Sequence, residues 1–268
     1  MDVRRAMPHA ALRSIIRCFE ERRAMLGAQV LAFPLIARPH QIIDIYLADP
    51  LRVRVDGGQL QAAPETVVVG PQGSRRIHIY ASGEVHIFNI LLQPAALHRL
   101  VGIDMTSLIN EGVAARDVLG RCATLLDDAV RSAHDFASRI AAAENYFGMM
   151  LERCPLDDGI GEASRSLLTA RGNMRIDTLA KQSGLSPRQF QRRFTTQVGL
   201  SPKLYARTIR FDHALAAHRN QPDVPWTNII HDAGYHDQAH FIRECHALVG
   251  LPPRQFIGDW DNIFFLHG

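Results

Sequence analysis

The chain has 268 residues, 47% of them hydrophobic and 21% charged, and a formal net charge of +3 at pH 7. This composition is typical of a globular protein and excludes a disordered or fibrous chain. Its apolar runs are interrupted within ten residues, well short of the roughly 20 residues that a helix needs to span a bilayer. We therefore expect neither a membrane-spanning segment nor a membrane partner.

The cysteines indicate the compartment. Cys18, Cys122, Cys154 and Cys245 lie far apart and form no CxxC pair, which argues against a disulfide framework and against a zinc knuckle. Unpaired cysteines fit a reducing environment, so we predict a cytoplasmic protein.

The N-terminal segment MDVRRAMPHAALRSIIRCFEERR is basic, contains Glu20 and Glu21, and lacks the continuous apolar core of a secretory signal. We interpret it as a helix of the mature protein. Residues 28–93 then contain short runs rich in Val and Ile that end at Gly, Pro or Asp, a pattern typical of a small antiparallel sandwich or barrel. The runs are AQVLAFPLIA, QIIDIYLAD, LRVRVDGG, TVVVGP, RRIHIYASG and EVHIFNILL, and ASGE predicts a hairpin turn.

From Pro94 onward, apolar residues recur at three- and four-residue spacing, which predicts helices. The segments are PAALHRLVG, MTSLINEG, AARDVLGRCATLLDDAVRS and AHDFASRIAAAENYFGMMLERC, and the last two predict an antiparallel pair. CPLDDGIG then predicts a linker. We therefore predict an α+β chain of two domains. Residues 1–155 form a β-rich, cupin-like barrel or sandwich with a helical pair, and residues 156–268 form an all-α domain.

The second domain contains an internal repeat, since GLSPRQFQRRFTTQVGLSPKLY aligns with GYHDQAHFIRECHALVGLPPRQF after one inserted residue. Seven matched pairs are all 51 residues apart, which predicts one supersecondary unit used twice. Phe190, Arg192, Phe194, Gly199, Leu200, Pro202 and Tyr205 match Phe241, Arg243, Cys245, Gly250, Leu251, Pro253 and Phe256.

The first copy has the pattern of a helix-turn-helix. Gly184 permits the left-handed conformation that ends a short helix, and Ser186 followed by Pro187 begins the next helix. Ala180 and Phe190 stand where this motif needs a small residue at the helix crossing and an apolar residue beneath it. The second helix is therefore expected to turn its Arg and Gln residues toward solvent.

These exposed residue types are the ones that read DNA in the major groove, because Arg donates two hydrogen bonds to guanine and Gln pairs with adenine. For a single segment, an ordinary solvated helix face is an equal alternative. The second copy favours DNA reading, since a rigid helix over residues 201–220 would hold both reading helices roughly one helical turn apart. Residues 160–268 also hold the charge surplus, with 13 Arg and Lys against 9 Asp and Glu.

Residues 161–257 resemble the DNA-binding domain of AraC/XylS-type bacterial transcription regulators, whose second-motif signature is close to AGYHDQAHFIRECHALVGLPPRQF. The resemblance implies double-stranded promoter DNA and RNA polymerase as partners. The implied base-reading residues are Arg188, Gln189, Gln191, Arg192, Gln238, Ala239, His240 and Arg243. The residues suited to phosphate are Ser186, Arg193, Ser201, Lys203 and Arg254.

The second motif departs from the family pattern. Cys245, His246 and Ala247 stand where the family usually has an aromatic residue followed by basic ones. Ile230 replaces a usual alanine, and Pro252 replaces the serine that caps the last helix. With less positive charge and no cap, the second motif is expected to grip phosphate less strongly than the first.

Polar residues on or beside the predicted strands are candidates for an effector pocket. They are Arg38, His40, Asp44, His78 and His86. Strand edges also carry such residues for solubility, which is the alternative. We predict that His78 and His86, facing each other across the ASGE hairpin, are an ordinary surface pair rather than a metal site.

No GxSxG, HExxH or P-loop pattern occurs, so we predict no enzymatic activity and no cofactor. One further group could be drawn as a metal site, but its spacing does not fit four-coordinate zinc. This group is His236, His240, Cys245 and His246. We predict no metal.

The sequence thus predicts a sequence-specific transcription regulator whose N-terminal domain binds a small effector or mediates dimerisation. Helices within residues 114–153 could form a dimer interface or be covered by their own sheet. Two other functions of the N-terminal domain stay open: a protein-interaction module without an effector, and a cupin-like metal enzyme with a helical accessory domain.

Overall fold

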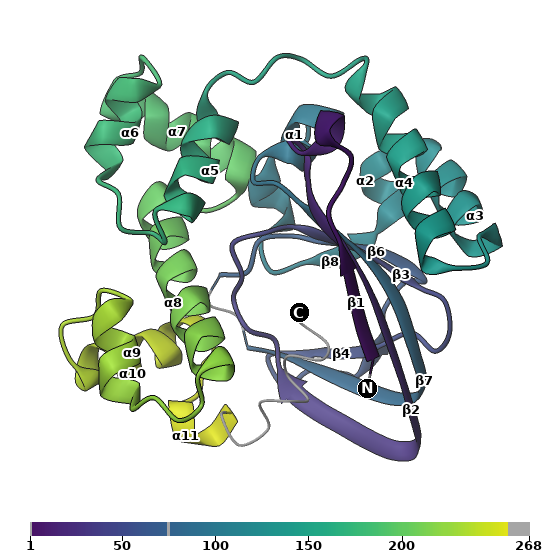
Figure 1. The fold of residues 1–268 in the computed structure, drawn as a ribbon, viewed down its shortest axis with the longest axis horizontal. Helices are drawn as coiled ribbons and strands as arrows, with labels where there is room; N and C mark the ends of the chain where they lie inside the picture. The colour runs from purple at the N-terminus through teal and green to yellow at the C-terminus, as the bar shows by residue number, and fades with distance from the viewer. Residues whose placement is uncertain (1, 74–75, 257–268) are drawn as a thin grey trace.

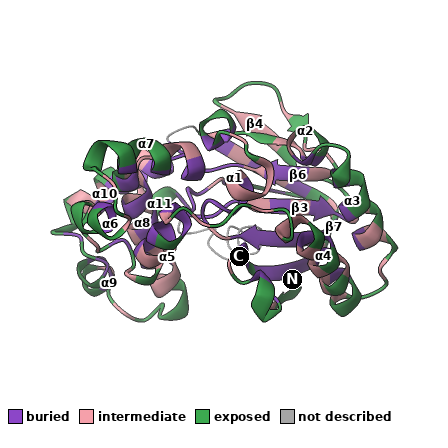
Figure 2. Ribbon diagram, turned by 90° about the horizontal axis from the view of Figure 1, so that it is seen from above, coloured by how far each residue is buried: buried purple, intermediate pink, exposed green. Residues whose placement is uncertain are grey.

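The computed structural model describes residues 2–73 and 76–256. Two parts lie side by side (Figure 1): a strongly curved sheet with helices packed on it, and a group of helices formed by the C-terminal residues. In both parts the elements bury one side and expose the other (Figure 2). This arrangement confirms the predicted α+β architecture.

The sheet is antiparallel throughout and has eight strands within the described residues. They are β1 (Asp2–Ala6), β2 (Ile16–Pro34), β3 (Ile42–Tyr46), β4 (Arg52–Val55), β5 (Gln61–Ala62), β6 (Thr66–Val69), β7 (Ile77–Leu92) and β8 (Gly112–Ala114). Their order is β1-β2-β7-β3-β6-β8, with β4 beside both β7 and β5. β7 is the centre of the sheet, since it pairs with β2 along one edge and with β3 and β4 along the other.

The N-terminal segment is not the helix that we predicted from its sequence. It forms β1, a short 3-10 helix (Ala10–Leu12) and the start of β2. Leu12, Ile15, Ile16 and Phe19 have helical spacing, yet all four are buried in the core of the sheet. The long ladder with β7 satisfies the backbone of β2 and lets β2 bury side chains, and this tertiary gain outweighs the local pattern.

The prediction of a hairpin at ASGE is also wrong, because β7 passes through this segment without a break. Gly83 (φ 72°) pairs with Gly27 (φ 56°) at an irregular point of the β2–β7 ladder. Both residues need the left-handed conformation that glycine tolerates. His78 and His86 therefore lie on one strand, eight residues and about 26 Å apart, and do not face each other.

Four α-helices follow β7 in the chain before the C-terminal part, and β8 lies between the first and the second. They are α1 (Ala96–Val101), α2 (Ala115–Leu119), α3 (Cys122–Ser132) and α4 (Phe136–Leu151). The predicted helix pair, α3 and α4, packs on the sheet (Figure 1). Leu126, Val130 and Phe147 share one core with Phe88 of β7. The apolar faces of the pair are therefore covered by their own sheet, whereas Leu125 is 61% exposed.

The C-terminal part is all helical, as predicted. Its helices are α5 (Ile160–Thr169), α6 (Ile176–Gln182), α7 (Pro187–Val198), α8 (Pro202–Asn220), α9 (Trp226–Asp232), α10 (Gln238–Leu248) and α11 (Pro253–Phe256). The boundary that we predicted at residues 155 and 156 falls between the end of α4 and the start of α5. Nothing in the described part of the chain has the length and apolarity of a bilayer-spanning helix.

The two parts share hydrophobic core. Phe33 and Ile36, at the end of β2 and just after it, belong to the same buried cluster as Phe211 and Leu215 of α8. This cluster continues to Phe241 of α10. The helix that links the two repeats is thus packed against the sheet as well as against its own repeats.

Candidate functional site

The first repeat forms a helix-turn-helix from α6, a glycine turn and α7. Gly184 (φ 66°) provides the left-handed turn. Ser186 begins α7 with a reciprocal cap: its Oγ accepts a hydrogen bond from the Gln189 N–H at 3.3 Å, and the Ser186 N–H donates to Gln189 Oε1 at 3.1 Å. Ala180 and Phe190 are buried in the same core, which confirms the predicted helix crossing.

The outward face of α7 presents the predicted base-reading residues. Arg188, Gln189, Gln191 and Arg192 are all exposed and occupy the N-terminal half of the helix, the part of a recognition helix that contacts base edges. Gln189 differs from the other three, because its Oε1 also accepts a hydrogen bond from Ser186 Oγ at 2.8 Å. Its amide nitrogen is the part left for a DNA contact.

The second repeat has the same plan. Gly234 (φ 87°) provides the turn, and Asp237 Oδ1 caps α10 by accepting from the His240 N–H at 2.6 Å. Gln238, Ala239 and Arg243 are exposed. His240 is half-buried, with its ring stacked on that of His236 at 6.0 Å between centroids.

The predicted phosphate-binding residues fall into two groups. Ser186 and Ser201 are N-caps, of α7 and α8 respectively, so they mark helix N-termini whose N–H groups suit phosphate. Lys203, Arg193 and Arg254 are exposed cations. Arg193 has a partner within the protein, because its Nη1 lies 3.6 Å from Asp158 Oδ2.

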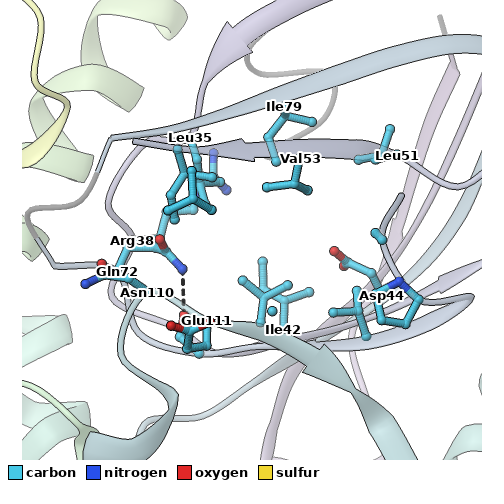
Figure 3. A pocket seen from close by; sticks show the side chains of 18 of the residues that line it. Leu35, Arg38, Ile42, Asp44, Leu51, Val53, Gln72, Ile79, Asn110 and Glu111 are labelled. Atoms are coloured by element: carbon cyan, nitrogen blue, oxygen red, sulfur yellow. Dashed lines mark hydrogen bonds between the residues drawn. The ribbon is translucent and has the colours of Figure 1, made fainter. Parts of the chain in front are cut away.

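A cavity of about 550 Å³ lies inside the curved sheet, between β3, β4, β6 and β7. Aliphatic side chains form most of its wall, among them Leu35, Ile42, Leu51, Val53 and Ile79 (Figure 3). Three of the five predicted effector-binding residues line it, namely Arg38, His40 and Asp44. In Figure 3, Arg38 and Asp44 lie on opposite sides of the cavity, and Arg38 points toward Glu111.

The other two predicted effector residues, His78 and His86, are not among the residues that line this cavity. His78 is half-buried on β7 beside Arg54 of β4. His86 interacts instead with Glu21, whose Oε1 lies 3.1 Å from His86 Nε2 and also accepts from Arg139 Nη1 at 2.7 Å. The expectation that the two histidines face each other was wrong, because β7 continues through ASGE without a hairpin.

Asp44 is one of two carboxylates of the cavity wall, and Glu111 is the other. Its neighbour across the ladder, Asn89 of β7, donates a hydrogen bond from Nδ2 to Asp44 Oδ1 at 2.6 Å. Asn89 is oriented in turn by Arg22, whose Nε donates to Asn89 Oδ1 at 2.9 Å. Burial raises the pKa of Asp44 to about 6, against the opposing effect of the Asn89 hydrogen bond. Sequence analysis missed Asn89 and Arg22, because nothing in their spacing separates them from other polar strand residues.

Arg38 and His40 also line the cavity. Burial lowers the pKa of Arg38 to about 10, while the nearby carboxylate of Asp212 on α8 favours its charged form. Burial, with Arg17 and Arg38 close by, lowers the pKa of His40 well below its usual value, so its ring is neutral. Arg17 Nη1 lies 2.9 Å from His40 Nδ1 and donates to it.

Metal ligation finds no support in the described part of the chain, where no group of three or more His, Cys, Asp or Glu side chains could hold an ion. The residues of the zinc alternative have other environments. Cys245 is fully buried, and burial raises the pKa of its thiol. His236 and His246 are exposed.

Sequence comparison identifies the C-terminal part. A family model described as a helix-turn-helix domain matches residues 179–258, which contain both glycine turns, α7 and α10. The C-terminal part of this chain is an AraC/XylS-type helix-turn-helix domain. No curated protein sequence matches the chain.

The fold around this AraC/XylS-type domain is similar to that of ToxT from Vibrio cholerae. ToxT of strain O395 has a TM-score of 0.50 at 10% sequence identity, over 93% of this chain and 98% of ToxT. An apo ToxT variant of strain SCE256 gives the same TM-score and identity, over 94% and 99% of the two chains. A ToxT structure with a bound unsaturated fatty acid has a TM-score of 0.49 at 10% identity, over 89% and 94%. At such low identity the similarity concerns the fold alone.

The AraC/XylS-type domain contacts the sheet part through the end of α7. Gly199, which ends this helix with φ 89°, lies so close to the sheet part that a Cβ there would be 2.4 Å from Pro71 Cγ and 2.9 Å from the Met105 carbonyl oxygen. Just before it, Gln197 Nε2 donates to Asp158 Oδ2 at 2.7 Å. The C-terminal end of α7 is therefore held in place, and its N-terminal half stays exposed.

In the second unit of the AraC/XylS-type domain, an ion pair joins α10 to α8. Glu244 of α10 is buried and accepts hydrogen bonds from Arg207 of α8, from Nε at 3.1 Å and from Nη2 at 2.8 Å. Neighbouring Arg243 remains exposed on the other side of α10. α8 thereby fixes the orientation of the second reading helix.

Proposed function

We propose that this protein is a transcription regulator that binds double-stranded promoter DNA through α7 and α10 and responds to a small molecule in the cavity of its sheet. The observation that carries the DNA-binding part is the pair of exposed reading helices at the two ends of one rigid helix. With 19 residues, α8 is about 28 Å long. That length is close to one turn of DNA, so two neighbouring major grooves on one face of the duplex are within reach.

The chemistry of the exposed residues supports sequence-specific reading. Arg188, Arg192 and Arg243 each carry a fork of donors that fits the edge of guanine, and Gln191 and Gln238 fit adenine. Arg192 and Arg243 are equivalent in the two repeats and both exposed. We assign them the central base contacts, and we assign Lys203, Arg254 and the capped starts of α7 and α8 to phosphate.

The cavity supports an effector role for the N-terminal part. Its volume and its largely aliphatic wall with a few polar groups are typical of small-molecule sites. Arg38 links the cavity to the DNA-binding part through Asp212 of α8. Burial raises the pKa of Asp212, and the nearby charge of Arg38 lowers it. A ligand that alters the environment of Arg38 would thus act on the helix that sets the spacing of the reading helices. Contact with RNA polymerase completes the proposed activity.

The DNA-binding role is tested with genomic fragments that the purified protein retains. Affinity is expected to fall steeply as salt rises from low to moderate concentration, because phosphate contacts release counterions. Arg192→Ala and Arg243→Ala should each relax sequence preference at one half of the site, with a loss of about 1–3 kcal/mol.

The matched control is Arg116→Ala, which removes an exposed arginine (83% exposed side chain) from α2 in the other part of the protein. It should leave affinity and sequence preference unchanged. If both reading-helix variants bind like wild type, the assignment of α7 and α10 as reading helices is wrong.

A further inference from the structure

Asp44 is a half-buried carboxylate that the protein satisfies on one side only. Its Oδ1 accepts from Asn89, and within the described residues no other side chain donates a hydrogen bond to it. Its carboxylate points into the cavity in Figure 3. Since a carboxylate that loses water without gaining donors is costly, this geometry favours an occupant that brings a hydrogen-bond donor.

The surroundings of Asp44 restrict the chemistry of that donor. Arg22 and Arg38 are close enough to favour the charged form of Asp44, and they would repel a ligand ammonium group. Glu20 opposes their effect on Asp44, but it is already paired with Arg5 and Arg22. A ligand carboxylate at this position would be repelled by Asp44 itself. A neutral hydroxyl group meets neither repulsion and can donate to the carboxylate oxygen.

The rest of the wall restricts the body of the ligand. Ile42, Leu51, Val53, Val67 and Ile79 all line the cavity, and Tyr46 is the one Phe, Tyr or Trp among its described lining residues. Such a wall offers dispersion contacts to aliphatic groups and little stacking for aromatic rings. The aliphatic part of the wall, next to a carboxylate paired on one side only, therefore matches an apolar body with a hydrogen-bond donor at the end that meets Asp44.

We propose that the cavity takes a chiefly aliphatic molecule that bears a hydroxyl group, and that this hydroxyl donates a hydrogen bond to Asp44. The inference rests on the proposed effector role of the cavity and adds the class of ligand. The carboxylate would select for molecules with a hydroxyl group. An equally apolar molecule without a donor displaces water from the cavity and leaves Asp44 with the Asn89 hydrogen bond alone.

The test uses the full-length protein and two isomers, 1-nonanol and 1-methoxyoctane. Both have one oxygen near the end of an aliphatic chain, but only the alcohol can donate. At about pH 7.5, titration calorimetry should show that the alcohol binds at least about tenfold more tightly, as in other sites built around a substrate hydroxyl. In Asp44→Ala the two isomers should bind with equal affinity. In the control Leu51→Ala, which removes part of the apolar wall and enlarges the cavity, the alcohol should keep its advantage.

A second measurement needs no variant. As the pH falls through about 6, Asp44 takes up a proton and becomes a donor itself, so the preference of the wild-type protein for the alcohol should shrink. The charged groups that set this titration are Arg22 and Glu20 of β2 and Arg38 after it, with Asn89 of β7 as hydrogen-bond partner. A preference that does not change between about pH 5 and 8 would contradict the role of Asp44.

The outcomes separate this inference from the function on which it rests. Equal affinity of the two isomers for the wild-type protein overturns the hydroxyl assignment and leaves the effector role of the cavity standing. Binding of neither isomer overturns the ligand class and removes the support that the cavity gives to an effector role. DNA binding, measured separately, is untouched by either result.

Discussion

The two helix-turn-helix units share a backbone plan but use equivalent positions differently. Arg192 and Arg243, equivalent in the repeat, are both exposed. At the next position the units diverge: Arg193 is exposed and paired with Asp158, whereas its equivalent Glu244 is buried and bound to Arg207 of α8. As a result, α7 carries three arginines and no acid, while α10 carries one arginine and one glutamate.

This difference suggests a separate task for each unit: one attracts DNA, and the other fixes the position of a helix. The first unit has three exposed arginines on α7, so we expect it to supply most of the electrostatic attraction for DNA. The second unit uses the same position to fix α10 on α8, which secures the spacing between the two reading helices. We therefore expect the two units to respond differently to equivalent substitutions.

The largest expected contrast is in the two cores. Phe194 is fully buried, with its ring 5.6 Å from that of Phe190 and 5.5 Å from that of Tyr205. Phe194→Ala should lower the free energy of unfolding by about 3–5 kcal/mol, because it leaves a cavity. Cys245→Ala deletes one heavy atom from the equivalent buried position and should cost about 0.5–1.5 kcal/mol, as for other single-atom truncations. Urea unfolding monitored by circular dichroism measures both. Equal losses would contradict the expected difference between the two cores.

A second contrast concerns the glycines that end the reading helices. Gly199 (φ 89°) and Gly250 (φ 80°) both lie in the left-handed region, where alanine costs about 1–2 kcal/mol. A Cβ at Gly199 would also meet the Pro71 ring and the Met105 carbonyl, which cannot move aside, whereas a Cβ at Gly250 would be 2.8 Å from Cγ of the exposed Arg76 side chain. Gly199→Ala should therefore cost about 2–4 kcal/mol in all, with the additional loss due to overpacking.

The control for this pair is Gly250→Ala, which should show the conformational cost alone, about 1–2 kcal/mol. Thermal melts of both variants provide the comparison. If Gly250→Ala proves the more destabilising, the close contact between α7 and the sheet part is not what distinguishes the two units.

Much of the C-terminal part could be predicted from the sequence because its signals are local. Glycines at the turns, Ser186 and Ser201 as caps, and a fixed offset of 51 residues define helices and repeat without knowledge of distant contacts. The N-terminal helix and the ASGE hairpin were predicted from equally local signals and were wrong. In both cases the pairing of β2 with β7, which joins residues 50 or more positions apart at these segments, decided the structure.

The same distinction applies to the functional residues. The reading residues follow from helical periodicity, which places Arg188 and Arg192 on the face opposite Phe190 and Phe194. Arg38, His40 and Asp44 were proposed from polarity alone, and they share a cavity only because the sheet curves. Asn89, which holds Asp44, gave no signal in the sequence because its partner lies 45 residues away on another strand.

A third contrast compares the two ion pairs. The side chain of Glu244 is 9% exposed and that of Arg207 is 32% exposed, whereas Asp158 and Arg193 are 39% and 46% exposed. Glu244→Gln should lower the free energy of unfolding by about 1–2 kcal/mol, because it weakens hydrogen bonds to a partly buried charge. Asp158→Asn should cost less than about 1 kcal/mol, since water and salt screen an exposed pair. Urea unfolding in low and high salt should show a salt dependence for the pair at Asp158 alone.

The smallest effect is expected in DNA binding. Asp158→Asn frees Arg193 for phosphate and removes a negative charge beside the first reading helix, while its amide oxygen can still accept the hydrogen bond from Gln197. Because an exposed ion pair contributes about 0.2–1 kcal/mol, affinity should rise by up to about fivefold, with the salt dependence steeper by up to about one counterion. Asp117→Asn, the same charge change on α2, is the control and should alter neither quantity. Unchanged affinity in Asp158→Asn would mean that Arg193 does not contact phosphate, and the stronger grip expected of the first unit would then rest on Arg188 and Arg192 alone.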